Sequence, residues 1–165
     1  MEMSEYLTMF VRESNAIEGI RRDPSKAEIA ALKTLLDRDF VLLVDLDAFV
    51  RVYQPDAMLR ERRGMNVCVG DYIAPDGGPQ IAGELGLLLE GANNLLSSPH
   101  GTHLAYERLH PFTDCNGRSG RALWLWMMWQ RGYRAELGFL HKFYYQTLES
   151  ADHDWMASHR PMAQR

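Results

Sequence analysis

The most informative part of the chain lies at residues 110–121 and reads H-P-F-T-D-C-N-G-R-S-G-R. His110 is the side chain in it that readily gives and takes a proton near neutral pH, so it could deprotonate a hydroxyl within hydrogen-bond reach. Asp114 follows, and a single carboxylate can hold Mg²⁺ together with phosphate oxygens and waters. Asn116 and Gly117 both tolerate positive φ, which predicts a tight turn whose backbone N–H groups point at an anion.

A helix is expected to begin at Gly117, with the positive end of its dipole facing the same anion. Arg118 and Arg121 are spaced i, i+3 on that helix, and their planar guanidinium groups suit phosphate oxygens. Each feature alone has a simpler explanation, such as a loop histidine, an N-cap or a solvated arginine pair. Their combination in one short stretch favours chemistry on a polyphosphate.

Helical periodicity dominates the rest of the chain. The pattern predicts helices over 5–20, 25–37, 41–53, 81–96, 99–109 and 117–131, and one or two more within 139–160. The apolar run at 122–129 is too short to span a bilayer and is interpreted as a buried helix. Five histidines lack convincing metal-ligand spacing and are assigned to structure or surface, namely His100, His103, His141, His153 and His159.

Residues 64–79 have a different pattern. Apolar Met65, Val67 and Val69 alternate with other residues, and the segment ends in P-D-G-G-P. This pattern predicts a short β-hairpin or an extended flap, although a plain surface loop is the simpler alternative. The sequence therefore predicts a mainly α single domain over 1–165 with one short hairpin.

Composition excludes several classes of protein. The chain has 165 residues, 46% of them hydrophobic, with a formal net charge of −4, which argues against a nucleic-acid partner. Two cysteines, Cys68 and Cys115, form no disulfide framework and fit a reducing compartment. The N-terminus lacks the basic start and apolar core of a signal peptide. We therefore expect a cytoplasmic protein that does not bind membranes.

The motif at 110–121 resembles the signature of the Fic family, whose members mostly transfer AMP from ATP to hydroxyl side chains of proteins. Chance gives such a match on the order of 10⁻⁹ per start position at ~5% usage per residue. The seven positions that match the family pattern are His110, Phe112, Asp114, Asn116, Gly117, Arg118 and Arg121. The resemblance implies a Fic-type helical bundle in which 64–79 forms a flap over the active site. The edge of this flap would take the target protein by adding a strand.

The resemblance also implies a role for each position. His110 would be the base that deprotonates the target hydroxyl, Phe112 would anchor the loop in the core, and Asp114 would bind Mg²⁺ beside the co-substrate ATP. The family usually has Gly or Ala where Cys115 stands, and a cation such as Arg118 nearby could make this thiol somewhat acidic.

The phosphates of ATP would lie along the loop and the helix start. By the resemblance, the N–H groups of Cys115, Asn116 and Gly117 hold the α- and β-phosphates, with the Asn116 side chain helping. Arg118 would support the β-phosphate and Arg121 the γ-phosphate. Catalysis of this kind depends mostly on positioning and charge neutralisation.

A second motif, S-N-A-I-E-G, starts at Ser14 and lies in the N-terminal segment 1–22. It looks like the inhibitory motif that one subclass of the family carries on an N-terminal helix. Ser14 and Glu18 are spaced i, i+4 and share one helix face, and Gly19 completes the motif, although it could equally be an ordinary C′ cap. The resemblance implies that Glu18 pairs with Arg121, which removes the partner of the γ-phosphate and misplaces the α-phosphorus. Ile20 replaces the Asn often seen after this motif.

These expectations give an autoinhibited protein adenylyltransferase that modifies Ser, Thr or Tyr of a target. One alternative is AMP removal by a water that Glu18 orients, and another is a non-catalytic nucleotide-binding module, which the intact His110 and Asp114 disfavour. Tyr144 and Tyr145 are candidates for self-modification. Whether the chain forms a homo-oligomer stays open, and relief of inhibition in the family is often tied to assembly.

Overall fold

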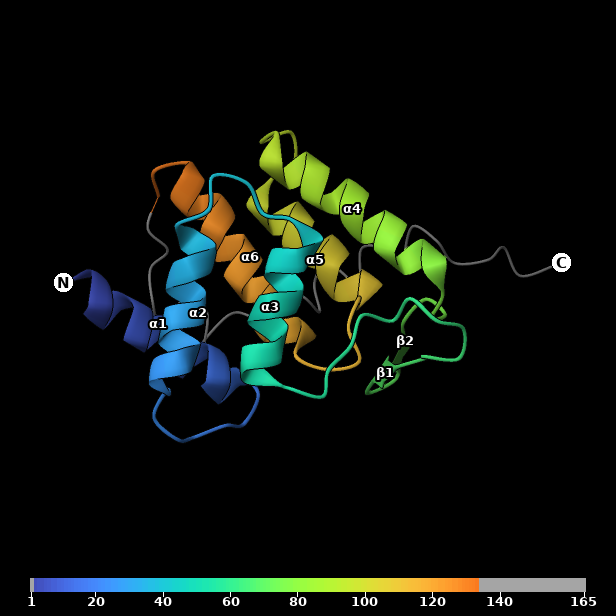
Figure 1. Ribbon diagram of the computed structural model, residues 1–165, viewed down its shortest axis with the longest axis horizontal. Coiled ribbons are helices and arrows are strands. Elements are labelled where there is room, and N and C mark those ends of the chain that lie inside the picture. Colours follow the sequence, from blue (N-terminus) through green and yellow to red (C-terminus); the bar gives the residue numbers. More distant parts are fainter. Residues whose placement is uncertain (1, 134–165) are drawn as a thin grey trace, which may run out of the picture.

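The structure is a computed structural model that describes residues 2–133, which form six α-helices and one two-stranded sheet (Figure 1). The helices are α1 (Met3–Ile17), α2 (Lys26–Leu36), α3 (Leu43–Tyr53), α4 (Pro79–Asn93), α5 (Pro99–Leu109) and α6 (Asn116–Gln130). The predicted mainly α fold is therefore confirmed. The helices expected within 139–160, three of the histidines and both candidate tyrosines lie outside the described residues.

Helix α6 lies at the centre of the bundle, where it contacts α1, α2, α3 and α5 (Figure 1). Leu123, Leu125, Trp126 and Met127 are almost fully buried, as the apolar run predicted. Burial of each such side chain contributes about 1.5–3 kcal/mol. The Trp126 indole N–H donates to the Arg38 carbonyl at 2.8 Å, so its polar atom is also satisfied.

No helix of residues 2–133 is long and apolar enough to cross a membrane.

Two helices begin where their capping residues predict. The Ser25 hydroxyl accepts from the Glu28 N–H while the Glu28 carboxylate accepts from the Ser25 N–H, which is a capping box. The Ser98 hydroxyl caps α5, and Pro99 follows at its first position, so the predicted range 99–109 is confirmed. Helix α3 begins two residues later than expected. The Asn93 side chain makes two bonds with the backbone of Val41, both of 2.9 Å, and holds that residue outside the helix.

The predicted hairpin is present but shorter than the segment 64–79. Strand β1 (Cys68–Val69) pairs antiparallel with β2 (Tyr72–Ile73), with Cys68 opposite Ile73 and Val69 opposite Tyr72. Gly70 in the turn has φ 58°, a conformation that glycine takes without steric cost. Beyond the strands, the Ala74 N–H donates to the Val67 carbonyl at 3.3 Å, and the Gly77 N–H donates to the side-chain oxygen of Asn66 at 2.9 Å.

A buried carboxylate on α2 holds the end of α1 and the segment that follows it. Glu28 is 1% exposed and accepts bonds from the Asn15 amide at 3.3 Å and from the Arg22 guanidinium at 2.8 Å. Burial alone would raise the pKa of Glu28, but the hydrogen bonds from Arg22 and Ser25 outweigh it and lower the pKa to about 2. This cluster fixes where residues 14–18 lie against α6.

Candidate active site

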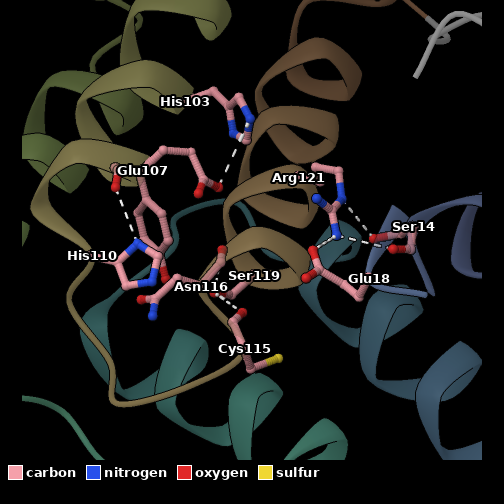
Figure 2. A network of polar contacts seen from close by, with 10 residues as sticks. Ser14, Glu18, His103, Glu107, His110, Cys115, Asn116, Ser119 and Arg121 are labelled. Atoms are coloured by element: carbon pink, nitrogen blue, oxygen red, sulfur yellow. Dashed lines mark hydrogen bonds and ion pairs between the residues drawn. The ribbon is translucent and has the colours of Figure 1, made fainter. Parts of the chain in front are cut away.

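A cavity of about 480 Å³ lies between the end of α1, the hairpin, the end of α5 and the start of α6. The hairpin contributes Val67, Cys68 and Val69 to its wall. The lining also contains seven predicted site residues, namely Glu18, His110, Asp114, Cys115, Asn116, Gly117 and Arg121. The structure thus gathers both sequence motifs and the hairpin around one space. Figure 2 shows residues of the two motifs from close by.

His110 ends helix α5 in a left-handed conformation, with φ 50° and ψ 60°. Its Nδ1 lies 3.2 Å from the Glu107 carbonyl oxygen (Figure 2). Because a carbonyl can only accept, Nδ1 carries the proton and Nε2 keeps its lone pair. Burial lowers the pKa of His110, so the ring is neutral at neutral pH. This is the protonation state that a general base requires.

The loop after His110 is closed by two side chains. Phe112 is fully buried, and the Asn116 side chain bonds both the N–H and the carbonyl of Phe112 at 2.8 Å. These two bonds give the Asn116 side chain a role in shaping the loop. The expected positive φ at Asn116 and Gly117 is wrong, because both lie in α6 and the left-handed residues are His110 and Cys115.

Cys115 is the N-cap residue of α6, with φ 67°. Left-handed backbone costs a residue with a side chain about 1 kcal/mol, which explains why glycine would suit this position. The expectation of an acidic thiol is wrong. Cys115 is 4% exposed, and burial raises its pKa to about 12, an effect that nearby Arg118 only partly offsets.

Asp114 lies exposed at the rim of the cavity. Its Oδ1 accepts from the Cys115 N–H at 2.5 Å. A hard carboxylate oxygen at the mouth of a cavity fits Mg²⁺ when substrate phosphates and waters complete the shell. Residues 2–133 contain no group of three His, Cys, Asp or Glu side chains that could hold a metal by themselves. Asp114 is thus one of three carboxylates that line the cavity, with Glu18 and Glu107.

The predicted contact between Glu18 and Arg121 is present. Arg121 is 1% exposed, and its Nη2 lies 2.5 Å from Glu18 Oε1 (Figure 2). The guanidinium also donates to the Ser14 hydroxyl at 2.9 Å and to the Ser14 carbonyl at 3.0 Å. One guanidinium from α6 thus donates to the hydroxyl and the carbonyl of Ser14 and to the carboxylate of Glu18. Helix α1 ends one residue before Glu18, and Gly19 then takes φ 75°, as a C′ glycine does.

Arg118 does not line the cavity. Its guanidinium lies 5.6 Å from the centre of the Tyr53 ring, and the residue is 7% exposed. A step of three residues turns a side chain by about 300° around a helix, so Arg118 and Arg121 point to faces about 60° apart. The structure therefore brings Arg121 to the cavity and places Arg118 against α3.

Three residues around the cavity were missed by the sequence analysis. Arg60 is fully buried and donates to four backbone carbonyls, including that of His110. The Tyr72 hydroxyl donates to the Arg108 carbonyl at 2.7 Å and ties the hairpin to α5. Glu107 lines the cavity, with Oε1 3.9 Å from Nε2 of buried His103. No local pattern marks Arg60, which stands in a run of charged residues.

Neither family models nor curated proteins give a match to this chain.

Proposed function

We propose that this chain is a Fic-type, autoinhibited protein adenylyltransferase that transfers AMP from ATP to a hydroxyl of a target protein. The observation that carries the proposal is the ion pair between Glu18 and Arg121, at 2.5 Å, in the wall of the cavity that also holds His110 and Asp114. The carboxylate comes from the residue that follows α1, and the guanidinium comes from α6, the last described helix. A purely structural pair would not need to share a cavity with a neutral histidine.

In the proposed reaction, the target hydroxyl oxygen attacks the α-phosphorus of ATP, and its proton passes to Nε2 of His110. The bond from the α-phosphorus to the oxygen that bridges to the β-phosphate breaks, and pyrophosphate leaves. The backbone N–H groups at the start of α6 and the guanidinium of Arg121 would bind phosphate oxygens. Bound at Asp114, Mg²⁺ would neutralise phosphate charge.

Inhibition follows from competition for one guanidinium. While Glu18 occupies Arg121, a γ-phosphate loses that partner and meets an additional negative charge. A misplacement of about 1 Å at the reacting centre can cost roughly a hundredfold in rate. The hairpin would present the target, since both strands have an outer edge and the Val69 and Ile73 side chains are 51% and 77% exposed. We place the protein in the cytoplasm.

The test is transfer of label from ATP carrying it at the α-phosphate, with Mg²⁺, by wild type, Glu18→Gly and Glu18→Gly with His110→Ala. We expect strong labelling of protein by Glu18→Gly alone. Transfer only from γ-labelled ATP would indicate a kinase-like reaction. Equal labelling by wild type and Glu18→Gly would contradict autoinhibition.

The second candidate is AMP removal from a modified protein. It is favoured by the Glu18 side chain, which is 36% exposed and lines the same cavity as His110, so it could orient an attacking water. Water would attack the phosphorus, and the bond to the side-chain oxygen would break with release of AMP. Glu18→Gly would then abolish AMP release, whereas it raises transfer in the first proposal.

A further inference from the structure

Arg60 is a buried cation that is held by backbone carbonyls. Its exposed fraction is 0%, and among residues 2–133 no carboxylate forms a salt bridge with it. Burial lowers the pKa of the guanidinium, but arginine still remains protonated in proteins. A buried charge is costly unless polar groups surround it. The carbonyls that surround Arg60 are therefore its compensation.

Those carbonyls come from two parts of the candidate site. Arg60 Nε donates to the His110 carbonyl at 2.6 Å, and Nη2 donates to the Leu109 carbonyl at 2.8 Å. Nη1 donates to the carbonyls of Met65 at 3.0 Å and Pro75 at 2.8 Å, at the base of the hairpin. One planar fork thus bridges the end of helix α5 and both ends of the hairpin segment.

The backbone around Arg60 follows the histidine loop as a short extended pair. The Arg60 N–H donates to the Pro111 carbonyl at 2.9 Å, and Leu59 forms an antiparallel bridge with Phe112. On the other side, the Arg60 carbonyl accepts from the Gly78 N–H at 2.9 Å. Backbone and side chain of Arg60 therefore hold the same two segments.

His110 needs such support because its backbone is left-handed. This conformation is unfavourable for a residue that carries a side chain. Hydrogen bonds from a charged donor are stronger than neutral ones, and the carbonyls at the end of α5 also carry the negative end of its dipole. The two bonds from Arg60 to the carbonyls of Leu109 and His110 therefore stabilise the backbone at this position.

We propose that Arg60 is a positioning residue, which holds the backbone of His110 in its left-handed conformation and ties it to the hairpin, so that the base and the target-binding edge keep one geometry. The inference rests on the proposed function for its catalytic consequence. Its structural content does not depend on that function. The charge of Arg60 also helps to keep the imidazole neutral, because it lowers the pKa of His110.

The experiment compares Arg60→Met, Arg60→Lys and the control Arg63→Met, which removes an exposed arginine three residues away. An NMR titration measures the pKa of the His110 ring, whose signal is assigned by its absence from the spectrum of His110→Ala. Hydrogen exchange is measured at the backbone amides of His110 and Ala74. In Arg60→Met we expect a higher pKa of His110 and at least tenfold faster exchange at both amides. Arg60→Lys keeps the positive charge and should therefore keep the low pKa of His110. It should still speed hydrogen exchange at both amides, because an ammonium group lacks the planar set of donors that a guanidinium has. Arg63→Met should match wild type.

The rate of AMP transfer gives a second, independent test of the role of Arg60. In the Glu18→Gly background, Arg60→Met should lower kcat for AMP transfer about tenfold or more with little change in the KM for ATP. If Glu18→Gly itself transfers no AMP, the proposed function fails while NMR and exchange still decide the role of Arg60. An unchanged His110 ring and unchanged exchange in both Arg60 variants would overturn the proposal. If Arg60→Met does not fold, Arg60→Lys decides, and if neither folds, Arg60 has a purely structural role and the proposal fails.

Discussion

The carboxylate of Glu18 lies against Gly117, where a β-carbon would collide with Oε1 of Glu18 and would stand 3.0 Å from Nη1 of Arg121. Gly117 is helical, so this glycine is required by the close approach of the carboxylate and not by an unusual φ. The position of Glu18, in the motif that starts at Ser14, thus depends on Gly117, a small residue inside the motif at 110–121.

Gly117→Ala should therefore displace Glu18 from Arg121 and activate the protein. Loss of about 1.4 kcal/mol from this contact would raise basal AMP transfer roughly tenfold. The matched control is Gly86→Ala in α4, where nothing lies within 4 Å of the added carbon, and it should leave transfer unchanged. Reduced transfer in Gly117→Ala, in a preparation where Glu18→Gly is active, would mean that the methyl group blocks the nucleotide instead.

Glu18→Gly should cost only about 1–2 kcal/mol of unfolding free energy, measured by urea denaturation. A fully buried ion pair typically loses about 3–5 kcal/mol when one partner is removed. Here the Glu18 side chain is 36% exposed, and Arg121 keeps both bonds to Ser14. A loss as large as that of a fully buried pair would show that Arg121 depends on Glu18 alone.

The pH dependence of AMP transfer should report the neutral state of His110. Since its pKa is lowered by burial, kcat/KM of Glu18→Gly should stay high at pH 6.5 and fall only as pH drops through the lower folded-state value. Initial rates between pH 5 and 8 test this expectation. An acid limb centred above pH 6.5 would contradict it.

The stability of the fold should fall in mild acid because of His103. Burial lowers the pKa of this histidine to about 3, with a further contribution from the charge of Arg121. Between that value and about 6.5 the unfolded chain binds a proton that the folded chain does not, so unfolding free energy rises with pH by up to about 1.4 kcal/mol per unit. His103→Gln should flatten this slope near pH 5, measured by urea denaturation, while His100→Gln on the exposed side of α5 should keep it. Equal slopes in wild type and His103→Gln would refute this assignment.

Removal of the buried carboxylate on α2 should loosen the inhibitory segment. Glu28→Gln leaves Asn15 and Arg22 with a neutral partner and should cost about 1–3 kcal/mol. Since residues 14–18 depend on this cluster for their position, we also expect higher basal transfer. The control is Asp37→Asn, which removes an exposed pair with Lys33 and should change neither quantity. Loss of stability without any gain in transfer would separate this cluster from inhibition.

The two thiols should differ sharply in reactivity. Cys68 is exposed on the hairpin, whereas burial raises the pKa of Cys115 to about 12. In the native protein a thiol reagent should therefore modify Cys68 quickly, whereas Cys115 should react only after unfolding. The same assay on Cys68→Ser should find no fast thiol, and a fast reaction there would show that Cys115 is accessible.

Local sequence signals predicted the helices well where a capping residue and a periodic apolar face agree. Ser98 and Pro99 gave the start of α5, and the end of the predicted range, Leu109, was also correct. The start of α3 was missed because it depends on Asn93, a residue far away in the chain. Bonds of this kind leave no periodic trace in the sequence.

The sequence analysis named many of the residues that line the cavity, but it placed Arg118 there wrongly, missed Glu107 and did not predict the backbone conformation. The contact of Glu18 with Arg121 followed from two motifs that share a chain. The left-handed residues were not predicted, because glycine and asparagine at 116–117 are better suited to positive φ than His110 and Cys115. The role of Arg60 could not be read from three nearby arginines of equal charge, since only the fold decides which one is enclosed by carbonyls.

The order of the two partners along the chain has a consequence for protein synthesis. Glu18 and Arg121 are separated by 103 positions, and the carboxylate belongs to the earlier part. A ribosome therefore releases the restraining segment well before it completes the helix that carries the guanidinium. If Glu18 inhibits as proposed, each new molecule acquires its cavity with the restraint already made, and activity begins only after a later event displaces it.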